Sequence, residues 1–217
     1  IFAELHRTAG RTETVNWNER YPCLNDATDA TGFDRHYIYH PAWAARIISR
    51  TRPFEHVDIS STLNFCTLLS AFIPTRFYDY RPASVILDGL RTSTADLVNL
   101  DFEDESIDSL SCMHVIEHIG LGRYGDQLDP MGDRKAANEL QRVLKKGGNL
   151  LIVVPVGRAR VQFNAHRIYD YQEFRNWFRE LELIEFSLIP DGEAPDGIVV
   201  NPPPSFVNNQ KYGCGCY

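Results

Sequence analysis

The sequence predicts an α/β fold, an open and mostly parallel sheet with helices on both faces. Two observations support this prediction. Short apolar runs alternate with helical patterns from residue 54 onward. The run at 150–154 is apolar at every position, as expected of a central parallel strand that is covered on both faces. Ligands of such sheets bind beyond the carboxyl ends of the strands, so we expect the chemistry in the loops that follow strands.

The individual elements follow from local patterns. Strands are expected at 54–59, 76–80, 107–113 and 150–154, with a further short strand that ends near residue 95. Helices are expected at 63–72, 133–144 and 171–179, an extended segment at 181–189, and a last edge strand at 212–217. In the helix at 133–144, Asp133 is placed to cap the first turn and Gly147 to supply a left-handed C-terminal cap.

Residues 1–52 are predicted to form an N-terminal extension that covers a domain at 53–217. The extension begins as a polar, irregular segment rich in turn formers. A helix is expected at 42–50, opened by Pro41, because the first helical position needs no N–H. Trp43 and Ile48 fall on one face of that helix.

Composition excludes several classes of protein. The 217 residues carry 29 acidic and 22 basic side chains, a net charge of −7, and no block of lysines and arginines. A dedicated nucleic-acid-binding protein is therefore not expected. The longest apolar run is far shorter than the roughly 20 residues of a membrane span, and no secretory signal is visible, so no membrane partner is expected. Five cysteines form no even disulfide framework, which predicts reduced thiols and a cytoplasmic protein.

Two acidic residues stand where parallel strands are expected to end. Asp58 lies at the end of the first predicted strand and is followed by small residues that open a helix. Asp79 lies about twenty residues later, the usual offset for an acid that accepts hydrogen bonds from ribose hydroxyls. The alternative is that both acids are helix caps or turn formers.

Three linked motifs carry a family resemblance. Residues 95–108 contain an Asp-Leu pair and an Asp-Phe turn, residues 114–118 end in Glu-His, and residues 139–148 contain Arg-Val-Leu-Lys-Lys-Gly-Gly. In their order and spacing these motifs resemble the class I S-adenosylmethionine-dependent methyltransferases, in their small-molecule type 11 branch. The resemblance covers residues 54 to about 156 in register.

The resemblance implies a Rossmann-like methyltransferase sheet, S-adenosylmethionine as cofactor, and methyl transfer to a small polar, sugar-type acceptor. It places the implied cofactor contacts at Asp58, Ser60, Ser61, Asp79, Asp96, Leu97 and Met113. Of these, Asp58 would lie near the methionine amino group, Asp79 at the ribose and Asp96 at the adenine amino group. Met113 would face the methyl donor.

The first loop departs from the family pattern. The family has glycine where this chain has Ser60, Thr62 and Asn64, and glycine permits close backbone approach and unusual dihedral angles. A second hypothesis therefore stands beside the first: a methyltransferase-fold protein with a degenerate glycine loop that is non-catalytic or binds another ligand.

A narrower resemblance lies in the Gly-Leu-Gly-Arg-Tyr-Gly-Asp segment at 120–126, together with residues 163–167 and 212–216. These segments resemble an uncharacterised family of methyltransferase-like domains of unknown function. The substrate-binding candidates are Arg123, Tyr124, Asp126, Asn164 and Arg167. Arginine suits a carboxylate or phosphate on a substrate, whereas the alternative for the first segment is a polar turn with an internal Arg–Asp pair.

Four side chains are candidates for catalysis: His114, Glu117, His118 and His166. His166 is a candidate general base, because imidazole titrates near neutral pH. Each of the four could instead be a structural residue of its loop.

The same residues also match a metal-binding pattern. His114, Glu117 and His118 spell the H-x-x-E-H motif of a class of zinc metalloproteases, which requires a helix and a third ligand. The surrounding pattern indicates a strand, so the methyltransferase interpretation is favoured. Cys214 and Cys216 alone form an incomplete site and are expected to pack against the sheet. The sequence thus predicts no metal centre.

Overall fold

The computed structural model describes residues 1–192 and 197–217. The chain divides into two compact units, residues 1–33 and residues 34–217. The first unit contains α1 (Phe2–Thr8) and the 3-10 helix η1 (Trp17–Glu19), and none of its side chains is buried. Within the described residues, no helix combines the length and the hydropathy that a membrane crossing requires.

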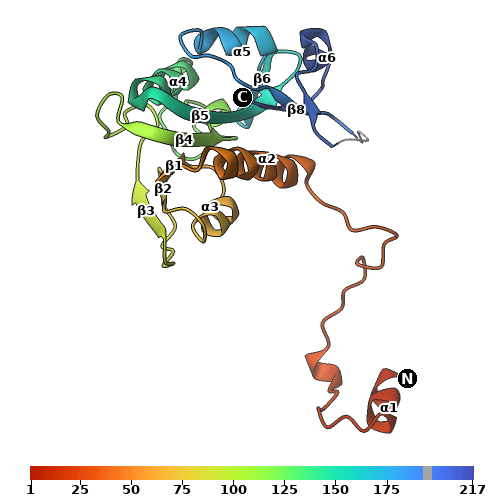
Figure 1. Cartoon of the computed structure of the whole chain (residues 1–217). Coiled ribbons are helices and arrows are strands. Elements are labelled where there is room, and N and C mark those ends of the chain that lie inside the picture. The colour runs from red at the N-terminus through yellow and green to blue at the C-terminus, as the bar shows by residue number, and fades with distance from the viewer. Residues whose placement is uncertain (193–196) are drawn as a thin grey trace. The chain divides into compact units, whose positions relative to one another are not determined.

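The described residues of the second unit form a large sheet, a two-stranded ribbon and six helical segments. Figure 1 shows helices on both faces of this sheet. The helices are α2 (Arg35–Thr51), α3 (Leu63–Leu69), η2 (Ile116–His118), α4 (Gly132–Val143), α5 (Tyr171–Trp177) and α6 (Pro204–Asn208). The strands of the sheet are β1 (His56–Ile59), β2 (Thr75–Asp79), β3 (Leu90–Thr94), β4 (Ile107–Met113), β5 (Leu144–Val156), β8 (Ser187–Ile189), β9 (Val199–Val200) and β10 (Gly213–Cys216). The ribbon pairs β6 (Arg160–Gln162) with β7 (His166–Ile168).

The sheet confirms the predicted α/β architecture. Its strand order is β3-β2-β1-β4-β5-β10-β8-β9, and β1 to β5 are all parallel to their neighbours in that part of the sheet. The carboxyl ends of the first four strands therefore meet at one edge, with β1 and β4 adjacent at the centre. From this pair, successive strands are added outward in opposite directions: β2 and β3 beside β1, and β5 beside β4. Doubly wound sheets bind ligands at such a point.

Both faces of the sheet are covered, which explains the uniformly apolar run in β5. Ile152 and Val154 pack into a core that includes Leu140 of α4. Leu151 and Val153 point to the opposite face and pack into a second core that includes Ile48 of α2. Alternation of side chains along a strand sends neighbours to opposite faces, so a strand between two helix layers has no polar positions.

Helix α2 begins earlier than the sequence predicts. It starts at Arg35, where the carboxylate of Asp34 accepts a hydrogen bond from the Tyr37 N–H at 3.2 Å, and Pro41 lies in the helix interior rather than at its first position. An interior proline costs a helix about 3 kcal/mol. Burial of Trp43 and Ile48 against the sheet offsets that cost. The helix therefore belongs to the second unit, and the boundary between the units falls at 33/34 rather than at 52/53.

The prediction of an edge strand at the C-terminal end of the sequence is wrong. β10 lies between β5 and β8 and is antiparallel to both. All four of its residues are buried. Gly215 explains how a strand fits there, because a Cβ at this position would lie 2.7 Å from Val156 Cγ1. An edge strand would not need so small a residue.

Helix α4 also differs in its caps. It begins at Gly132 with Met131 at the N-cap, so Asp133 lies inside the first turn, where it accepts a hydrogen bond from the Tyr169 hydroxyl at 3.1 Å. The helix ends at Val143, and Gly147 adopts the expected left-handed conformation (φ 80°) within β5 instead of capping the helix.

Candidate functional site

A cavity of about 500 Å³ opens at the carboxyl edge of the sheet. The carboxyl end of each of the first four strands contributes to its wall, through residues that include Ser60, Asp79, Asp96 and His114. Residues of η2 and of the glycine-rich segment after it, including His118, close the other side. The volume lies within the range of small-molecule sites in proteins. The loops singled out from the sequence are thus brought together around one space.

Ser60 keeps the backbone conformation of the glycine that it replaces. Its φ is +57°, in the left-handed region, and its N–H donates to the Tyr78 carbonyl at 2.6 Å. A non-glycine residue there costs about 1 kcal/mol, so the fold retains the turn despite the substitution. Thr62 has a separate role, because its hydroxyl accepts from the Phe65 N–H and caps α3. Asn64 lies in the first turn of that helix.

Asp79 and Asp96 act both as turn formers and as part of the cavity wall. One carboxylate oxygen of Asp79 accepts from the Arg81 N–H at 2.7 Å, and one of Asp96 accepts from the Val98 N–H at 3.1 Å. A carboxylate has further acceptor positions, which the turn does not use. Leu97, buried beside Asp96, adds an apolar surface to the same wall.

Asp58 lies beneath the first loop rather than in the cavity lining. Its fully buried carboxylate accepts from the Ser61 N–H at 3.0 Å and from the Ser111 hydroxyl of β4. The Ser111 hydroxyl also contacts His56 Nε2 at 2.9 Å. Burial raises the pKa of Asp58 to about 6 and lowers that of His56 to about 4. The carboxylate therefore joins the β1 loop to β4, and the expected contact with a methionine amino group does not follow from its position.

Ser61 and Met113 complete this connection. The Met113 N–H donates to the Ser61 hydroxyl at 3.0 Å, and the Met113 side chain is buried in the core on the α2 side of the sheet. Neither residue lines the large cavity; Ser61 lines a second one, of about 380 Å³, beside Thr62 and Asp79.

His114 occupies a strained position at the end of β4, with φ +58°. Its Nδ1 lies 2.8 Å from Glu117 Oε1, and both side chains are almost fully buried. Burial lowers the pKa of His114 to about 4 and raises that of Glu117 to about 7. The neutral ring therefore donates Nδ1–H to the carboxyl group, and Glu117 lies behind the cavity wall instead of lining it.

His118 lines the cavity, and its Nε2 lies 3.8 Å from Glu117 Oε1, beyond hydrogen-bond distance. Its Nδ1 lies 2.6 Å from the Ala165 carbonyl, which fixes the proton on Nδ1 and leaves the lone pair on Nε2. Burial lowers its pKa, which keeps the ring neutral near pH 7. Arg123 donates to the same carbonyl at 3.0 Å, so this exposed side chain supports the His118 environment rather than pairing with Asp126.

The glycine-rich segment folds around the Asp126 carboxylate. That carboxylate accepts from the N–H groups of Gly120, Gly122 and Tyr124 at 2.7 to 3.3 Å. Burial alone would raise the pKa of Asp126, but these donors hold it below its usual value. Gly120 is required, because a Cβ there would lie 2.0 Å from the Asp129 carbonyl oxygen. Tyr124 lines the cavity, with the Arg81 guanidinium 5.2 Å from its ring centroid.

Three further predicted site residues, like Asp58, Ser61, Met113, Glu117 and Arg123, lie outside the lining of the large cavity. Arg167 is buried and donates to the Ile119 carbonyl at 2.7 Å, with its Nε 3.3 Å from Asp133, so it joins η2 to α4. Asn164 is exposed at the turn of the β6–β7 ribbon. His166 contacts Gln162 Oε1 at 2.6 Å through Nε2, and burial lowers its pKa.

The H-x-x-E-H pattern does not lie on an α-helix. His114 ends a strand, whereas Glu117 and His118 lie on the single turn η2. The two histidines therefore lack the one-face helical geometry that the zinc protease motif requires. The structure also brings residues to the site that the sequence did not reveal, such as His36, Tyr37 and His40, whose rings surround His114. Arg81 was detectable, since it follows Asp79 in a loop already singled out.

The fold is shared with solved methyltransferases. The Bacillus halodurans protein BH2331, provisionally described as a methyltransferase, has a TM-score of 0.53 at 15% identity, and the match covers 81% of this chain and 96% of that one. The SAM-dependent methyltransferase TM1293 of Thermotoga maritima has a TM-score of 0.51 at 17% identity, covering 84% and 90%. The chain has the class I methyltransferase fold. This agrees with the predicted Rossmann-like sheet.

Sequence comparisons are less informative about this methyltransferase-fold chain. Residues 93–187 match a family described as a Caenorhabditis protein of unknown function. A 64-residue stretch is 33% identical to the uncharacterised protein MJ0638 of Methanocaldococcus jannaschii, which covers 30% of this chain. The match spans about a quarter (23%) of that relative's length. Neither description names an activity.

The buried Asp58 gives a prediction about stability. Its folded pKa lies above the unfolded value, so the folded state holds the proton more tightly, and stability falls as pH rises from about 4 to 6. Asp58→Asn removes that penalty and retains an acceptor for the Ser61 N–H. Between pH 4.5 and 7, the unfolding free energy of Asp58→Asn should rise relative to wild type by about 2 kcal/mol. Urea denaturation at several pH values measures this difference.

The quantity to compare is the unfolding free energy of Asp58→Asn minus that of wild type at each pH. The pKa of His56 is lowered on folding, which makes stability rise with pH, and this contribution cancels in the comparison. Asp101→Asn, at an exposed position, is the matched control and should show no such trend. A difference between Asp58→Asn and wild type that does not change with pH would contradict the assignment of a raised pKa.

Proposed function

We propose that the chain is an S-adenosylmethionine-dependent methyltransferase that acts on a small polar acceptor. One observation carries the proposal: the carboxylates at the ends of β2 and β3, Asp79 and Asp96, face the same cavity as the left-handed turn at Ser60. The class I fold supports it, since solved neighbours of this fold include SAM-dependent methyltransferases.

The residues present fit this cofactor. Ribose hydroxyls and an adenine amino group are hydrogen-bond donors, and Asp79 and Asp96 offer acceptor positions that their own turns leave unused. Leu97 gives an apolar surface for a purine ring beside Asp96. Ser60 retains the tight turn, so the backbone of the first loop stays close to the cavity.

The chain's own contribution to the reaction is orientation and removal of one proton. When bound, S-adenosylmethionine supplies a methyl group that its sulfonium charge already activates. His118 would accept the proton of an acceptor hydroxyl or amine at Nε2, because its Nδ1–H is held by the Ala165 carbonyl. The burial that lowers its pKa keeps the ring neutral and therefore able to accept. The cavity holds the two reactants together, which removes most of the entropic barrier.

The cavity lining supports a small polar acceptor. Besides Tyr124 and Asp126, the segment after η2 contributes Gln127, Asp129 and Lys135 to the wall. Lys135 lies 2.6 Å from Asp129, so these two charges offset one another, and Asp126 leaves this part of the wall with a negative charge. A neutral, hydroxyl-rich molecule such as a sugar suits such a surface better than an anion or a lipid.

A second candidate is favoured by the side chains at 60, 62 and 64. They add atoms to a loop that is glycine-rich in the methyltransferase family, and Thr62 is committed to capping α3. Under this alternative the fold binds another ligand or none in the cavity. Cofactor titration separates the two candidates.

The proposal predicts cofactor-product binding that depends on Asp79. S-adenosylhomocysteine should bind the full chain with micromolar affinity in calorimetric titration. Asp79→Ala should weaken binding by about 30-fold or more, because it removes the carboxylate that accepts charge-assisted hydrogen bonds from the ribose hydroxyls. Asp101→Ala, another acid of the strand-end loops that lies outside the cavity lining, should bind as wild type does. If S-adenosylhomocysteine gives no heat of binding with the folded wild-type chain, the second candidate is favoured.

Methyl transfer itself is tested at His118. A panel of small hydroxyl and amine compounds is incubated with the cofactor, and release of S-adenosylhomocysteine is measured. His118→Asn retains a donor for the Ala165 carbonyl but no proton acceptor equivalent to Nε2, so kcat with the active compound should fall by about 100-fold or more. Affinity for S-adenosylhomocysteine should stay within about threefold. An unchanged kcat would remove His118 from the proposed mechanism.

A further inference from the structure

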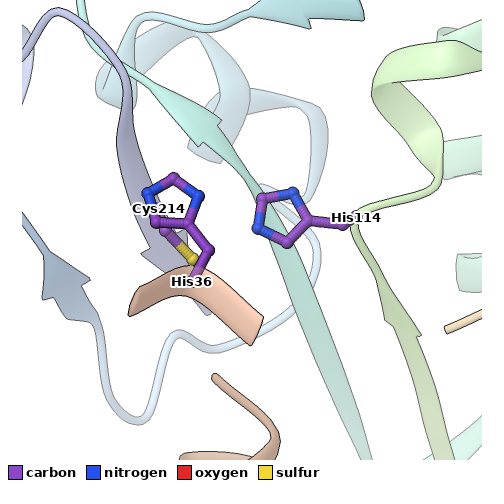
Figure 2. A group of neighbouring side chains, drawn as sticks. All are labelled: His36, His114 and Cys214. Carbon is purple, nitrogen blue, oxygen red and sulfur yellow. The ribbon is translucent and has the colours of Figure 1, made fainter. Parts of the chain in front are cut away.

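Three metal-ligating side chains meet beside the cavity, on segments that are far apart in the sequence. His36 comes from α2, His114 from the end of β4 and Cys214 from β10, and one ligand atom of each lies within 4.8 Å of the others. Figure 2 shows the rings of His36 and His114 side by side, with the sulfur of Cys214 close to His36. The two ring centroids are 5.4 Å apart and the ring planes are nearly parallel. The parallel β1–β5 sheet and the insertion of β10 next to β5 create this meeting point.

The orientation of His114 is that of a metal ligand. Its Nδ1 contacts the Glu117 carboxylate at 2.8 Å, whereas its Nε2 is buried and has no hydrogen-bond partner. The side chain is only 3% exposed. Metal-bound histidines characteristically donate one ring N–H to a carboxylate and direct the other nitrogen at the ion. A buried imidazole nitrogen without a partner is uncommon in folded proteins. Among the described residues, His40 also has buried ring nitrogens without a partner, and its ring lies 5.1 Å from that of His114.

We propose that His36, His114 and Cys214 bind one zinc ion. Two imidazole nitrogens and one thiolate are a ligand set for borderline transition metals, zinc above all, and not for magnesium or calcium, which prefer oxygen. Binding would convert the Cys214 thiol to a thiolate and release its proton to solvent. Three protein ligands leave a fourth position for water or a substrate atom.

The existing geometry needs little adjustment. Ligand atoms around tetrahedral zinc lie about 3.3 to 3.7 Å apart, so side-chain shifts of about 1 Å bring these three together. Neighbouring rings hold the two histidines near this arrangement, because Tyr212 stacks on His36 and Tyr37 stacks on His114, with centroids 5.1 and 5.5 Å apart.

A zinc ion here would link helix α2 directly to two strands that lie on either side of β5. It would fasten α2 to the ends of β4 and β10, and His114 would place it on the wall of the cavity. This inference stands independently of the proposed methyl transfer, because it rests on the three ligands and on the orientation of His114.

Cobalt substitution tests the site in the full chain. Metal-free protein is titrated with Co²⁺, and with Zn²⁺ in competition with a chromophoric chelator, in a Cys23→Ser background that removes the exposed thiol of the N-terminal unit. We expect one equivalent of metal and a thiolate-to-cobalt charge-transfer band in the near ultraviolet. Cys214→Ser should abolish the band. Cys216→Ser, whose sulfur lies 4.0 Å from that of Cys214 on the same strand, should leave it intact.

His36→Ala provides a second variant if Cys214→Ser does not fold. It should keep the circular dichroism spectrum of the parent and bind zinc more than about 100-fold more weakly, and zinc should raise the Tm of the parent but not that of His36→Ala. The proposal is overturned if the folded parent binds less than about 0.1 equivalent at micromolar free zinc. It is also overturned if His36→Ala binds as tightly as the parent, or if Cys216→Ser loses the band.

Discussion

The site depends on the parallel pairing of the first four strands. In the order β3-β2-β1-β4, every strand ends at the same edge of the sheet, and each is followed by a loop that contributes to the cavity. An antiparallel arrangement would send alternate loops to the opposite edge and disperse Ser60, Asp79, Asp96 and His114. Parallel pairing in turn requires burial of both sheet faces, which α2 and α3 provide on one side and α4 to α6 on the other (Figure 1).

A buried polar connection holds the central pair of strands in register at this edge. Asp58 accepts hydrogen bonds from the Ser61 N–H and the Ser111 hydroxyl, and the Met113 N–H donates to the Ser61 hydroxyl. Charge is costly at so buried a position, which is why the pKa of Asp58 is raised. The same bonds fix the backbone of the loop that retains a left-handed residue at 60. The loop thus holds a left-handed turn at a residue other than glycine.

Local patterns in the sequence were sufficient to predict the architecture. The apolar run in β5 and the alternation of strands with helices gave the α/β class, and the loop acids Asp79 and Asp96 were placed correctly at strand ends. Two errors arose where tertiary packing outweighed a local signal: Pro41 is tolerated inside α2 because the helix buries a strong apolar face, and Gly215 serves an inner strand rather than an edge. The histidine cluster around His114 could not be predicted from the sequence, because only the folded topology brings α2 and β10 to the end of β4.

Several predicted site residues have structural partners in the folded chain. Arg167 and Asp126 have the chemistry expected of substrate-binding groups, but Arg167 donates to the Ile119 carbonyl after η2, and Asp126 accepts from N–H groups of its own loop. A sequence pattern identifies residues that can bind a ligand. It does not show whether other groups of the protein already occupy their hydrogen-bonding positions. Asp126 lines the same cavity as Asp79, Asp96 and His118, but three N–H groups of its own loop already donate to its carboxylate.

The most direct test of the cavity as a cofactor site is a crystal structure of the full chain with S-adenosylhomocysteine. The account predicts ribose hydroxyls at hydrogen-bonding distance, about 2.7 Å, from the Asp79 carboxylate, and the adenine between Leu97 and the Asp96 side chain. Ligand bound elsewhere on the chain, or a cavity that excludes it at saturating concentration because the side chains of residues 60–64 occupy the space, would contradict the central claim.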